Sequence, residues 1–430
     1  MKTQPLMTPF EELLESCYQT SMPSPIRAKA WDKLIQKGLP DKRFEAFTYV
    51  PMRHLYQASY EISKSSAITK EDLSPFIMEE CRHSVIVFID GVYSSELSCL
   101  PTDITVMPIS KAEKGSYGGF LQKRSQERLE KETDPFVLMN LALHDEGVFF
   151  FLPPKKELQS PIQSLCVTTK QGSIFQPRIQ IVIGAHAKMS WITSYAHLGE
   201  NQHFFQNTVM DISLEDESVF DHTLYMNTPK QSWNFFALRA SLKKASSLEC
   251  KNFSPGAKGS RQDYYITLLG EESDAKISGL TWTAHHYQSH AHVTVDHCAP
   301  NCTSNQFFKG VLSGSSHTSF TGKIMVRKLA QKTLAYQLNN SLLLEEGAIA
   351  YSKPGLEIFA DDVKASHGAT VSQLNEDQLF YLKTRGLSDG MAKNLLVAGF
   401  CRDIIEKVPI DSLKTAMITS IENYIREYNP

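Results

Sequence analysis

Strand-like segments return at a nearly constant distance along this chain of 430 residues. From about residue 84, short β-branched runs such as RIQIVIG (178–184) and KIMVRK (323–328) are bounded by Gly, Ser, Asn or Asp. Small or polar residues at strand starts form one series with steps of 31, 29, 28, 28 and 29, at His186, Glu217, Ser246, Asp274, Cys302 and Gln331. A second series interleaves with steps of 29, 28, 29, 28 and 30, at His203, Ser232, Ser260, Ser289, His317 and Gly347.

Two interleaved series indicate two strand passes per coil of about 30 residues, which is typical of β-solenoids. The repeat has no strict consensus sequence, so an irregular antiparallel sandwich remains the alternative. The spacing therefore predicts a mainly β protein with a β-solenoid core.

Both ends of the chain have helix signals instead. Thr8-Pro9-Phe10-Glu11 supplies an N-cap, a proline and a capping-box acid, and a second helix is predicted between Ser24-Pro25 and Gly38. Near the other end, Asn375, Ser388 and Asp411 each open a helical pattern. We therefore expect a helical N-terminal region over 1–83, a β-solenoid core over 84–374 and a helical C-terminal region over 375–430.

Composition excludes several partners. The chain has 44 basic and 47 acidic residues, a formal charge of -3, so we expect neither nucleic acid nor a membrane surface as a ligand. The N-terminus lacks the apolar core of a signal peptide and no run of 18 apolar residues occurs, which predicts a cytoplasmic protein. The 8 cysteines are mostly scattered, as free thiols are.

The densest set of metal-ligand side chains lies in TAHHYQSHAHVTVDHCAPNC (283–302). His290 and His292 share one face of a strand and could chelate a metal, but Val293 and Val295 then point into the core, so the histidines belong to the outer surface. We expect an exposed polar face with incidental histidines. Cys298 and Cys302 are expected to be buried thiols near a turn.

Other catalytic patterns are weak. Ser388 fits the G-x-S-x-G pattern, but the residues before it are helical, so it is expected to cap a helix rather than act as a nucleophile. No Walker A sequence occurs. Because acidic residues occur at 215–217 and 271–272, a solenoid enzyme that acts on polysaccharides remains an alternative, although turns are expected at both places.

Five motifs follow one another in the second half of the chain: PNCTSNQFFKGVL (300–312), FTGKI (320–324), AQKTLAYQLNNSLLL (330–344), KPGLEIFADDVKASHGAT (353–370) and LFYLKTRGL (379–387). In this order they resemble the SufB/SufD family of iron–sulfur cluster assembly proteins. GLPDKRFEAFTYVPM (38–52) and the Ser-His-Gly at 366–368 place the chain nearer to the SufD branch.

The resemblance implies a right-handed parallel β-helix and a non-catalytic scaffold subunit. It implies pairing with SufB through the end strands of the β-helix and docking of the SufC ATPase on the C-terminal helices. In such an assembly SufC binds ATP, SUF sulfur donors act indirectly, the iron–sulfur cluster is transient, and a reduced flavin is a further candidate. We expect no tightly bound cofactor in the isolated chain.

The resemblance also gives His367 a role as an iron or nascent-cluster ligand at the SufB interface. Imidazole is an ordinary iron ligand that titrates near neutrality. Many relatives carry Cys where this chain has Ala365, so a thiolate from that position is missing. The neighbouring Asp361 and Asp362 are expected to be solvated or bonded to backbone amides. A polysaccharide-acting solenoid enzyme, an independent metal-binding protein, and a homodimer in the absence of a sister chain remain alternatives.

Overall fold

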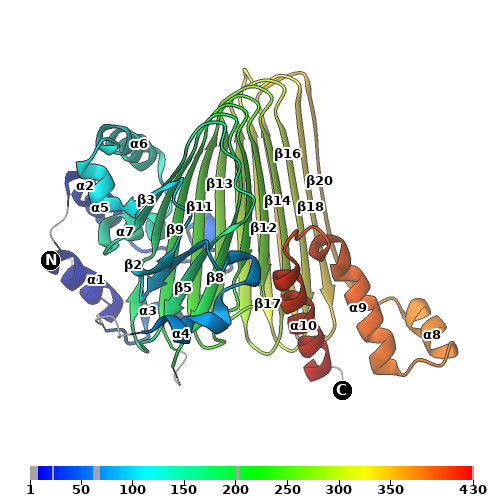
Figure 1. The fold of residues 1–430 in the computed structure, drawn as a ribbon. Coiled ribbons are helices and arrows are strands. Elements are labelled where there is room, and N and C mark those ends of the chain that lie inside the picture. The colour runs from blue at the N-terminus through cyan, green and yellow to red at the C-terminus, as the bar shows by residue number, and fades with distance from the viewer. Residues whose placement is uncertain (1–7, 22–23, 62–67, 200–202, 429–430) are drawn as a thin grey trace, which may run out of the picture.

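The computed structural model describes residues 8–21, 24–61, 68–199 and 203–428. It is a mainly β structure in which a parallel β-solenoid of about 8 turns carries helices at both ends of the chain (Figure 1). Neighbouring strands from β4 onward pair in parallel, so the antiparallel sandwich is excluded and the predicted solenoid is confirmed.

Successive coils contribute one strand to each of two facing sheets. Sheet 1 consists of β2 (Val92–Cys99), β1 (Val85–Ile89), β5 (Ile162–Thr168), β8 (Lys188–His197), β10 (Val219–Tyr225), β12 (Ser247–Ser254), β14 (Asp274–Thr283), β16 (Thr303–Leu312), β18 (Thr333–Leu343) and β20 (Val363–Gln373), in this spatial order. Sheet 2 consists of β19 (Ile349–Ile358), β17 (His317–Val326), β15 (Gln288–His297), β13 (Gly259–Leu268), β11 (Trp233–Leu242), β9 (Phe205–Leu214), β7 (Arg178–Ile183), β4 (Val148–Leu152) and β3 (Thr105–Pro108), with β6 (Ile174–Phe175) paired to β9.

One corner of the coil explains the first sequence series. The second residue of a two-residue turn has positive φ on each successive coil, at Lys155, His186, Glu217, Ala245, Glu272, Asn301 and Lys332. From His186 to Lys332 these residues coincide with the series or lie within two positions of it. Each turn donates a backbone hydrogen bond to the next coil: the N–H of His186 lies 2.9 Å from the carbonyl of Asp216, and that of Glu217 2.8 Å from Lys244. The repeat therefore marks a stack of turns, each of which has one residue in the left-handed backbone conformation.

The solenoid interior is filled by side chains that alternate along each strand. Trp191, Phe236, Tyr264 and Val295 belong to one large cluster between the two sheets. Because parallel strands in register place paired residues on the same face, each interior side chain stacks on its equivalent in the next coil.

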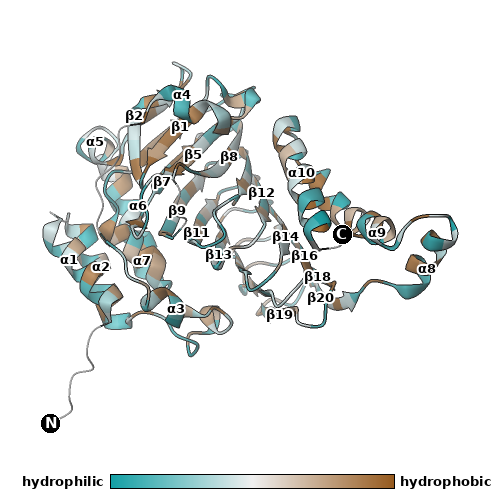
Figure 2. Cartoon of the chain, turned by 90° about the horizontal axis from the view of Figure 1, so that it is seen from below, coloured by the Kyte–Doolittle hydropathy of each residue, from teal (hydrophilic) through white to brown (hydrophobic). Residues whose placement is uncertain are grey.

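Helices from the first part of the chain cover the outer face of sheet 2. They are α1 (Pro9–Thr20), α2 (Pro25–Lys37), η1 (Glu45–Phe47), α3 (Met52–Tyr56), α6 (Gly118–Lys131) and α7 (Pro135–Leu143), while α4 (Lys70–Leu73), η2 (Ser74–Phe76), η3 (Glu79–Cys81) and α5 (Ile109–Lys114) complete this region. Buried ion pairs hold the layer to the sheet, since Arg239 Nε lies 2.8 Å from Glu132 and Arg261 2.8 Å from Asp134. Figure 2 shows α1, α2, α6 and α7 on one side of the solenoid and α10 on the other.

The helices α5 to α7 interrupt a stretch that the sequence reading treated as continuous strands. Asp134 caps α7, accepting a hydrogen bond from the N–H of Phe136 at 2.8 Å. Eight of the nine residues of α7 are buried, so it has no polar face. A short apolar helix without amphipathic periodicity looks like a buried strand in sequence.

The C-terminal region is α8 (Glu376–Thr384), α9 (Asp389–Ile405) and α10 (Asp411–Tyr428). The predicted caps Asn375 and Ser388 are confirmed, because Asn375 accepts from the N–H of Gln378 and Ser388 from that of Met391. Asp411 is the first residue of α10. Leu413 and Met417 of α10 pack on the outer face of sheet 1, whereas α8 stands away from the solenoid (Figure 1). None of the described helices is long and apolar enough to cross a membrane.

Candidate functional site

The last coil of the solenoid is left open. In the described chain, β19 pairs only with β17 and β20 only with β18, so each presents a free edge of backbone N–H and C=O groups. Most residues of β20 are exposed, in contrast to the buried strands of earlier coils. Large apolar side chains are also exposed around this end, at Leu334, Tyr336, Leu338, Ile349, Ile358, Phe359 and Val371.

His367 lies in the middle of β20, on the face that continues the interior. Its register partner is Gln337 of β18, which is buried, whereas Tyr336 and Leu338 on either side of Gln337 point outward and are exposed. His367 itself is exposed because no further coil covers it. Among the described residues the imidazole of His367 has neither a hydrogen bond nor an ion pair, so both ring nitrogens are available.

The residues around His367 fall into two groups. Ala365, at the position where a cysteine would have supplied a thiolate, packs against the small apolar cluster that contains Ile324 and Ala335. Asp362 is part of the corner turn, where its N–H donates to Oε1 of Gln331 at 2.9 Å and its carbonyl accepts from the N–H of Lys332 at 2.6 Å. Asp361 and Asp362 are both exposed and lie before the start of β20 at Val363.

The sequence reading missed two interior glutamines beside this histidine. Gln306 of β16 pairs in register with Gln337 of β18, which pairs with His367. Both are buried, and neither amide has a hydrogen-bond partner among the described residues. The interior neighbours of Gln306 are Ser304 and Phe308, and those of Gln337 are Ala335 and Asn339. Because polar side chains occur on both faces of these strands, the sequence pattern alone did not assign the two glutamines to the interior.

The histidines of 283–302 do not form a metal site in the described chain, where no group of three or more His, Cys, Asp or Glu side chains could hold an ion. The predicted face of His290 and His292 is correct, but its exposure is wrong. His290 is buried and bonds Ser319 at 2.8 Å, and His292 lies 2.7 Å from Asp263. The helical layer on sheet 2 covers this face, which a strand pattern cannot show. Burial lowers the pKa of His290 to about 3, so the ring is neutral.

The remaining candidates have structural roles. Cys302 is buried, with its thiol 3.3 Å from the carbonyl of Gly270, whereas Cys298 is half-buried. Burial raises the pKa of Cys298 to about 11, which disfavours a thiolate. The acids at 215–217 and 271–272 lie on corner turns, where Glu215 pairs with Lys243 at 2.5 Å and Glu271 with Lys244 at 3.0 Å. They do not form a catalytic carboxylate cluster.

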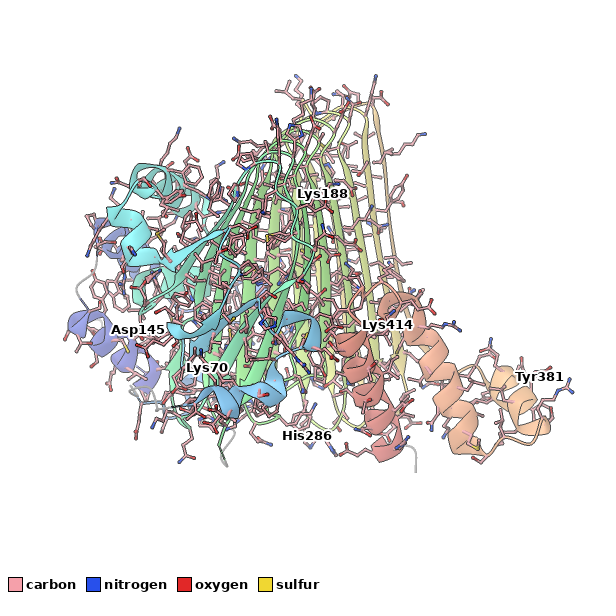
Figure 3. The ribbon with its side chains drawn as sticks, viewed as in Figure 1. Lys70, Asp145, Lys188, His286, Tyr381 and Lys414 are labelled. Atoms are coloured by element: carbon pink, nitrogen blue, oxygen red, sulfur yellow. The ribbon has the colours of Figure 1, made fainter. Side chains whose placement is uncertain are left out.

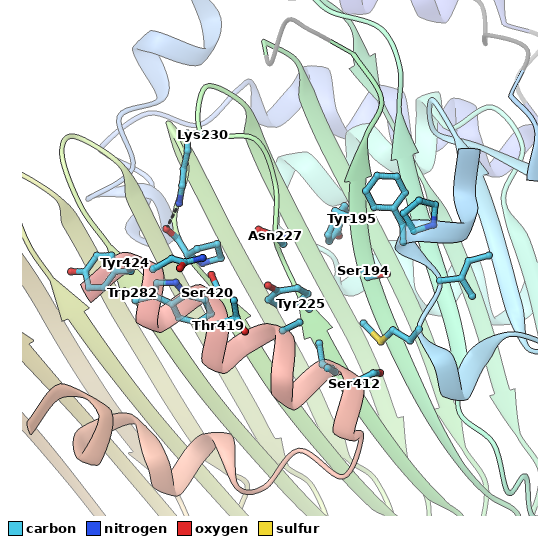
Figure 4. Close-up of a pocket in the computed structure, with 18 of the residues that line it drawn as sticks. Ser194, Tyr195, Tyr225, Asn227, Lys230, Trp282, Ser412, Thr419, Ser420 and Tyr424 are labelled. Carbon is cyan, nitrogen blue, oxygen red and sulfur yellow. Dashed lines mark hydrogen bonds between the residues drawn. The ribbon is translucent and has the colours of Figure 1, made fainter. Parts of the chain in front are cut away.

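A cavity of about 720 Å³ lies between α10 and the outer face of sheet 1 (Figure 4). Tyr225, Trp282 and Tyr424 line it, and Lys230 donates to the backbone carbonyls of Pro255 at 2.9 Å and Gly256 at 3.3 Å. Its described lining contains no cysteine or histidine, and its acidic side chains are those of Glu79 and Glu427. The open end of the solenoid, where an imidazole has no partner among the described residues, is the stronger candidate for a ligand site.

A second exposed surface lies on the C-terminal helices. Phe380 and Tyr381 of α8 and Met391 and Leu395 of α9 are more than half exposed, and a depression lined by Tyr381, Leu382, Leu395 and Leu396 separates the two helices. Figure 3 shows Tyr381 at the outermost part of the molecule, far from His286 at the edge of the solenoid. This surface is defined below as the α8–α9 surface.

Comparison with known proteins gives two family matches. Residues 166–400 match the family described as "SUF system FeS cluster assembly, SufBD core domain", and residues 5–164 match "SufBD protein N-terminal region". A SufBD family protein of iron–sulfur cluster assembly from Synechocystis is 29% identical over 403 residues, covering 90% of this chain and 88% of the relative. The iron–sulfur cluster assembly protein SufD of Escherichia coli is 24% identical over 407 residues, covering 93% and 92%. The chloroplastic protein ABCI7 of Arabidopsis thaliana is 25% identical over 420 residues, covering 93% and 86%.

Proposed function

This chain belongs to the SufB/SufD family of iron–sulfur cluster assembly proteins, and from that premise we propose that it is a non-catalytic scaffold subunit of the SUF assembly complex. In this proposal its last coil pairs with SufB, its α8–α9 surface binds the SufC ATPase, and His367 is one ligand of the iron or nascent cluster at the junction. The observation that carries the proposal is an interior-facing, unbonded histidine at the open end of a solenoid.

The open end suits a sister solenoid. The free edges of β19 and β20 can continue both sheets by backbone hydrogen bonding, and the exposed apolar side chains around them supply area to bury. The same edges can pair with a second copy of this chain, which is how a homodimer would form when SufB is absent.

One imidazole is an incomplete metal site. Iron centres bound by protein need several ligands, and the described residues form no group of three or more His, Cys, Asp or Glu side chains that could hold an ion. The other ligands in this proposal come from SufB and from sulfide that the sulfur-donor proteins supply. A transient cluster fits such a shared site, because the site exists only while the two chains are paired.

The α8–α9 surface suits a protein partner. Phe380 is 70% exposed and Leu395 is 54% exposed, and the helices present them away from the solenoid (Figure 1). The sequence has no Walker A motif, so in this proposal SufC binds the ATP. The cytoplasm as the compartment and a reduced flavin in the assembled complex remain predictions.

Pairing is tested by co-expression with SufB and SufC of the same organism, followed by affinity purification and size-exclusion chromatography. We expect Val371→Asp on β20 to release SufB and Leu395→Asp on α9 to release SufC. The matched controls are Leu269→Asp on a corner turn and Ile35→Asp on α2, which are also exposed leucine and isoleucine side chains and should leave both partners bound. Retention of SufB by Val371→Asp would refute the interface assigned to the last coil.

The metal role is tested by His367→Ala in the purified complex, with His286→Ala on an exposed loop as the control. We expect reconstitution with Fe²⁺ and sulfide to give far less cluster absorbance for His367→Ala while the complex elutes at its normal size. Normal cluster formation by an intact His367→Ala complex would contradict the ligand role.

A further inference from the structure

The interior column that ends at His367 changes character along the solenoid. In sheet 1, register pairing links one interior residue from each of eight successive strands, Ile162, Trp191, His222, Cys250, Ile277, Gln306, Gln337 and His367. The early positions are mostly apolar and belong to the main core cluster. The last three positions carry two amides and an imidazole.

The two glutamines are costly to bury as they stand. Gln306 is 0% exposed and Gln337 is 3% exposed, and both atoms of both amides lack a hydrogen-bond partner among the described residues. A buried polar group without a partner costs about 1–3 kcal/mol, and methionine at either position would avoid that cost. Polar groups that weaken the core are characteristic of positions that serve a function.

The place of Gln337 indicates that function. Adjacent parallel strands lie about 4.8 Å apart, so a glutamine side chain can span the distance to a paired histidine on the same face. A histidine that binds a metal through one ring nitrogen almost always donates its other N–H to an oxygen acceptor, which fixes the ring and makes it a better ligand. Oε1 of Gln337 is an unengaged acceptor beside His367.

Gln306 is placed to hold the amide of Gln337 in position. It is the next residue of the column, and the facing strand β17 has Gly322 opposite it. A Cβ atom at Gly322 would lie 2.9 Å from Oε1 of Gln306, so the glycine leaves room for this amide to turn. The amide N–H of Gln306 can then donate to Gln337.

We propose that Gln337 is a positioning residue for His367: its Oε1 accepts a hydrogen bond from the imidazole N–H that faces the solenoid interior when the opposite nitrogen binds iron. Gln306 donates to Gln337 and holds its amide in the accepting orientation. This inference rests on the proposed function of His367 and names the residues that orient the ligand.

The test uses Gln337→Met, Gln337→Glu and Gln306→Met in the purified SufB–SufC complex. Iron retention at the nascent site is followed by absorbance between pH 8 and pH 5. We expect Gln337→Met to weaken iron binding about 10- to 100-fold. Since protons compete with iron for the imidazole, the pH midpoint of iron release should rise by about one unit for each tenfold loss. Gln337→Glu keeps an acceptor oxygen and should restore the midpoint.

The control is Gln262→Met, which changes another buried interior glutamine. Gln262 has partners, with Nε2 2.7 Å from Ser260, so its replacement should lower the melting temperature and leave the pH midpoint unchanged. Gln337→Met should not lower the melting temperature of the isolated chain, because no hydrogen bond is lost there.

The outcomes separate this inference from the proposed function. An assembled Gln337→Met complex with the wild-type midpoint would overturn the positioning role if His367→Ala still abolishes iron retention. If His367→Ala also leaves iron retention unchanged, the proposed ligand role fails first. A rise in midpoint that Gln337→Glu reverses supports the positioning role.

Discussion

The aromatic ring of Tyr49 stacks on that of Tyr351, with ring centroids 4.2 Å apart and planes 15° apart. Tyr49 belongs to the N-terminal region and Tyr351 to β19 in the last coil. A second contact lies nearby, since Lys353 of β19 is 2.7 Å from Glu45. The N-terminal layer therefore reaches along sheet 2 to the open end of the solenoid and holds its terminal strand.

We expect Tyr49→Ala to loosen β19. The stacked pair contributes about 0.5–1.5 kcal/mol beyond the area that it buries, and β19 has only one paired neighbour to replace that loss. Hydrogen exchange measured by mass spectrometry should be faster over residues 349–358 and unchanged in β11. Tyr18→Ala, which removes a stacking partner of Trp31 elsewhere in the helical layer, is the control. Equal exchange of β19 in both variants would contradict the contact.

Lys309 is expected to hold the C-terminal end of α9 on the solenoid. Its Nζ lies 2.8 Å from the carbonyl of Phe400 and 2.8 Å from the carboxylate of Asp403, and it sits 4.6 Å from the centroid of the Phe400 ring. Lys309→Met should raise the rate of limited proteolysis within 375–405 several-fold. Lys276→Met, an exposed lysine on β14 of the same sheet, should not. Unchanged cleavage in Lys309→Met would show that apolar packing alone holds α9.

Stability should fall as the pH is lowered from 7 to 5. Burial lowers the pKa of His144, His222 and His290 to about 3 each, below the ordinary value near 6.5. The unfolded chain therefore binds more protons below pH 6.5, so stability is fully present above that pH and is lost as the pH falls, at up to about 1.4 kcal/mol per pH unit for each histidine.

The measurement is the urea midpoint at pH 7.5 and pH 5.5. His222→Gln removes one of the buried imidazoles and should reduce the difference between the two midpoints. His286→Gln, on an exposed loop, should leave the difference as it is in the parent chain. The interpretation fails if His222→Gln and the parent chain lose the same stability on acidification.

The predictable part of the fold is the part with local signals. The corner turns stack coil on coil, so their small and polar residues recur at visible intervals, and Ser388 and Asn375 cap helices by contacts within a few residues. The helix α7 escaped prediction because it is buried on all sides and shows no periodic pattern. Exposure of His290 was predicted wrongly because a layer distant in sequence covers it.

The candidate site was predictable in part for the same reason. His367 follows from a family motif, but the two strand series end at Gln331 and Gly347 and do not reach β20, which carries it. The interior direction of its side chain and its pairing with Gln337 depend on the register between β18 and β20, which no local pattern of the two strands fixes. Gln306 and Gln337 read as ordinary polar strand residues until the register places them in the core.

The stacked corner leads to a prediction about Ala245. This residue has φ of 51° and donates its backbone N–H to the carbonyl of Glu271 at 2.8 Å on the next coil. A side chain at positive φ costs about 1–2 kcal/mol, which glycine avoids while keeping the N–H, although glycine also raises the entropy of the unfolded chain. Ala245→Gly should therefore raise the thermal midpoint, with a net gain of about 0.5–1 kcal/mol.

Ala245→Val should lower the midpoint, because a β-branched residue is least tolerated there. Ala240→Gly in buried β11 is the matched control and should lower it, since a packed methyl group is lost. A lower midpoint for Ala245→Gly would mean that the corner gains nothing from relief of its left-handed conformation.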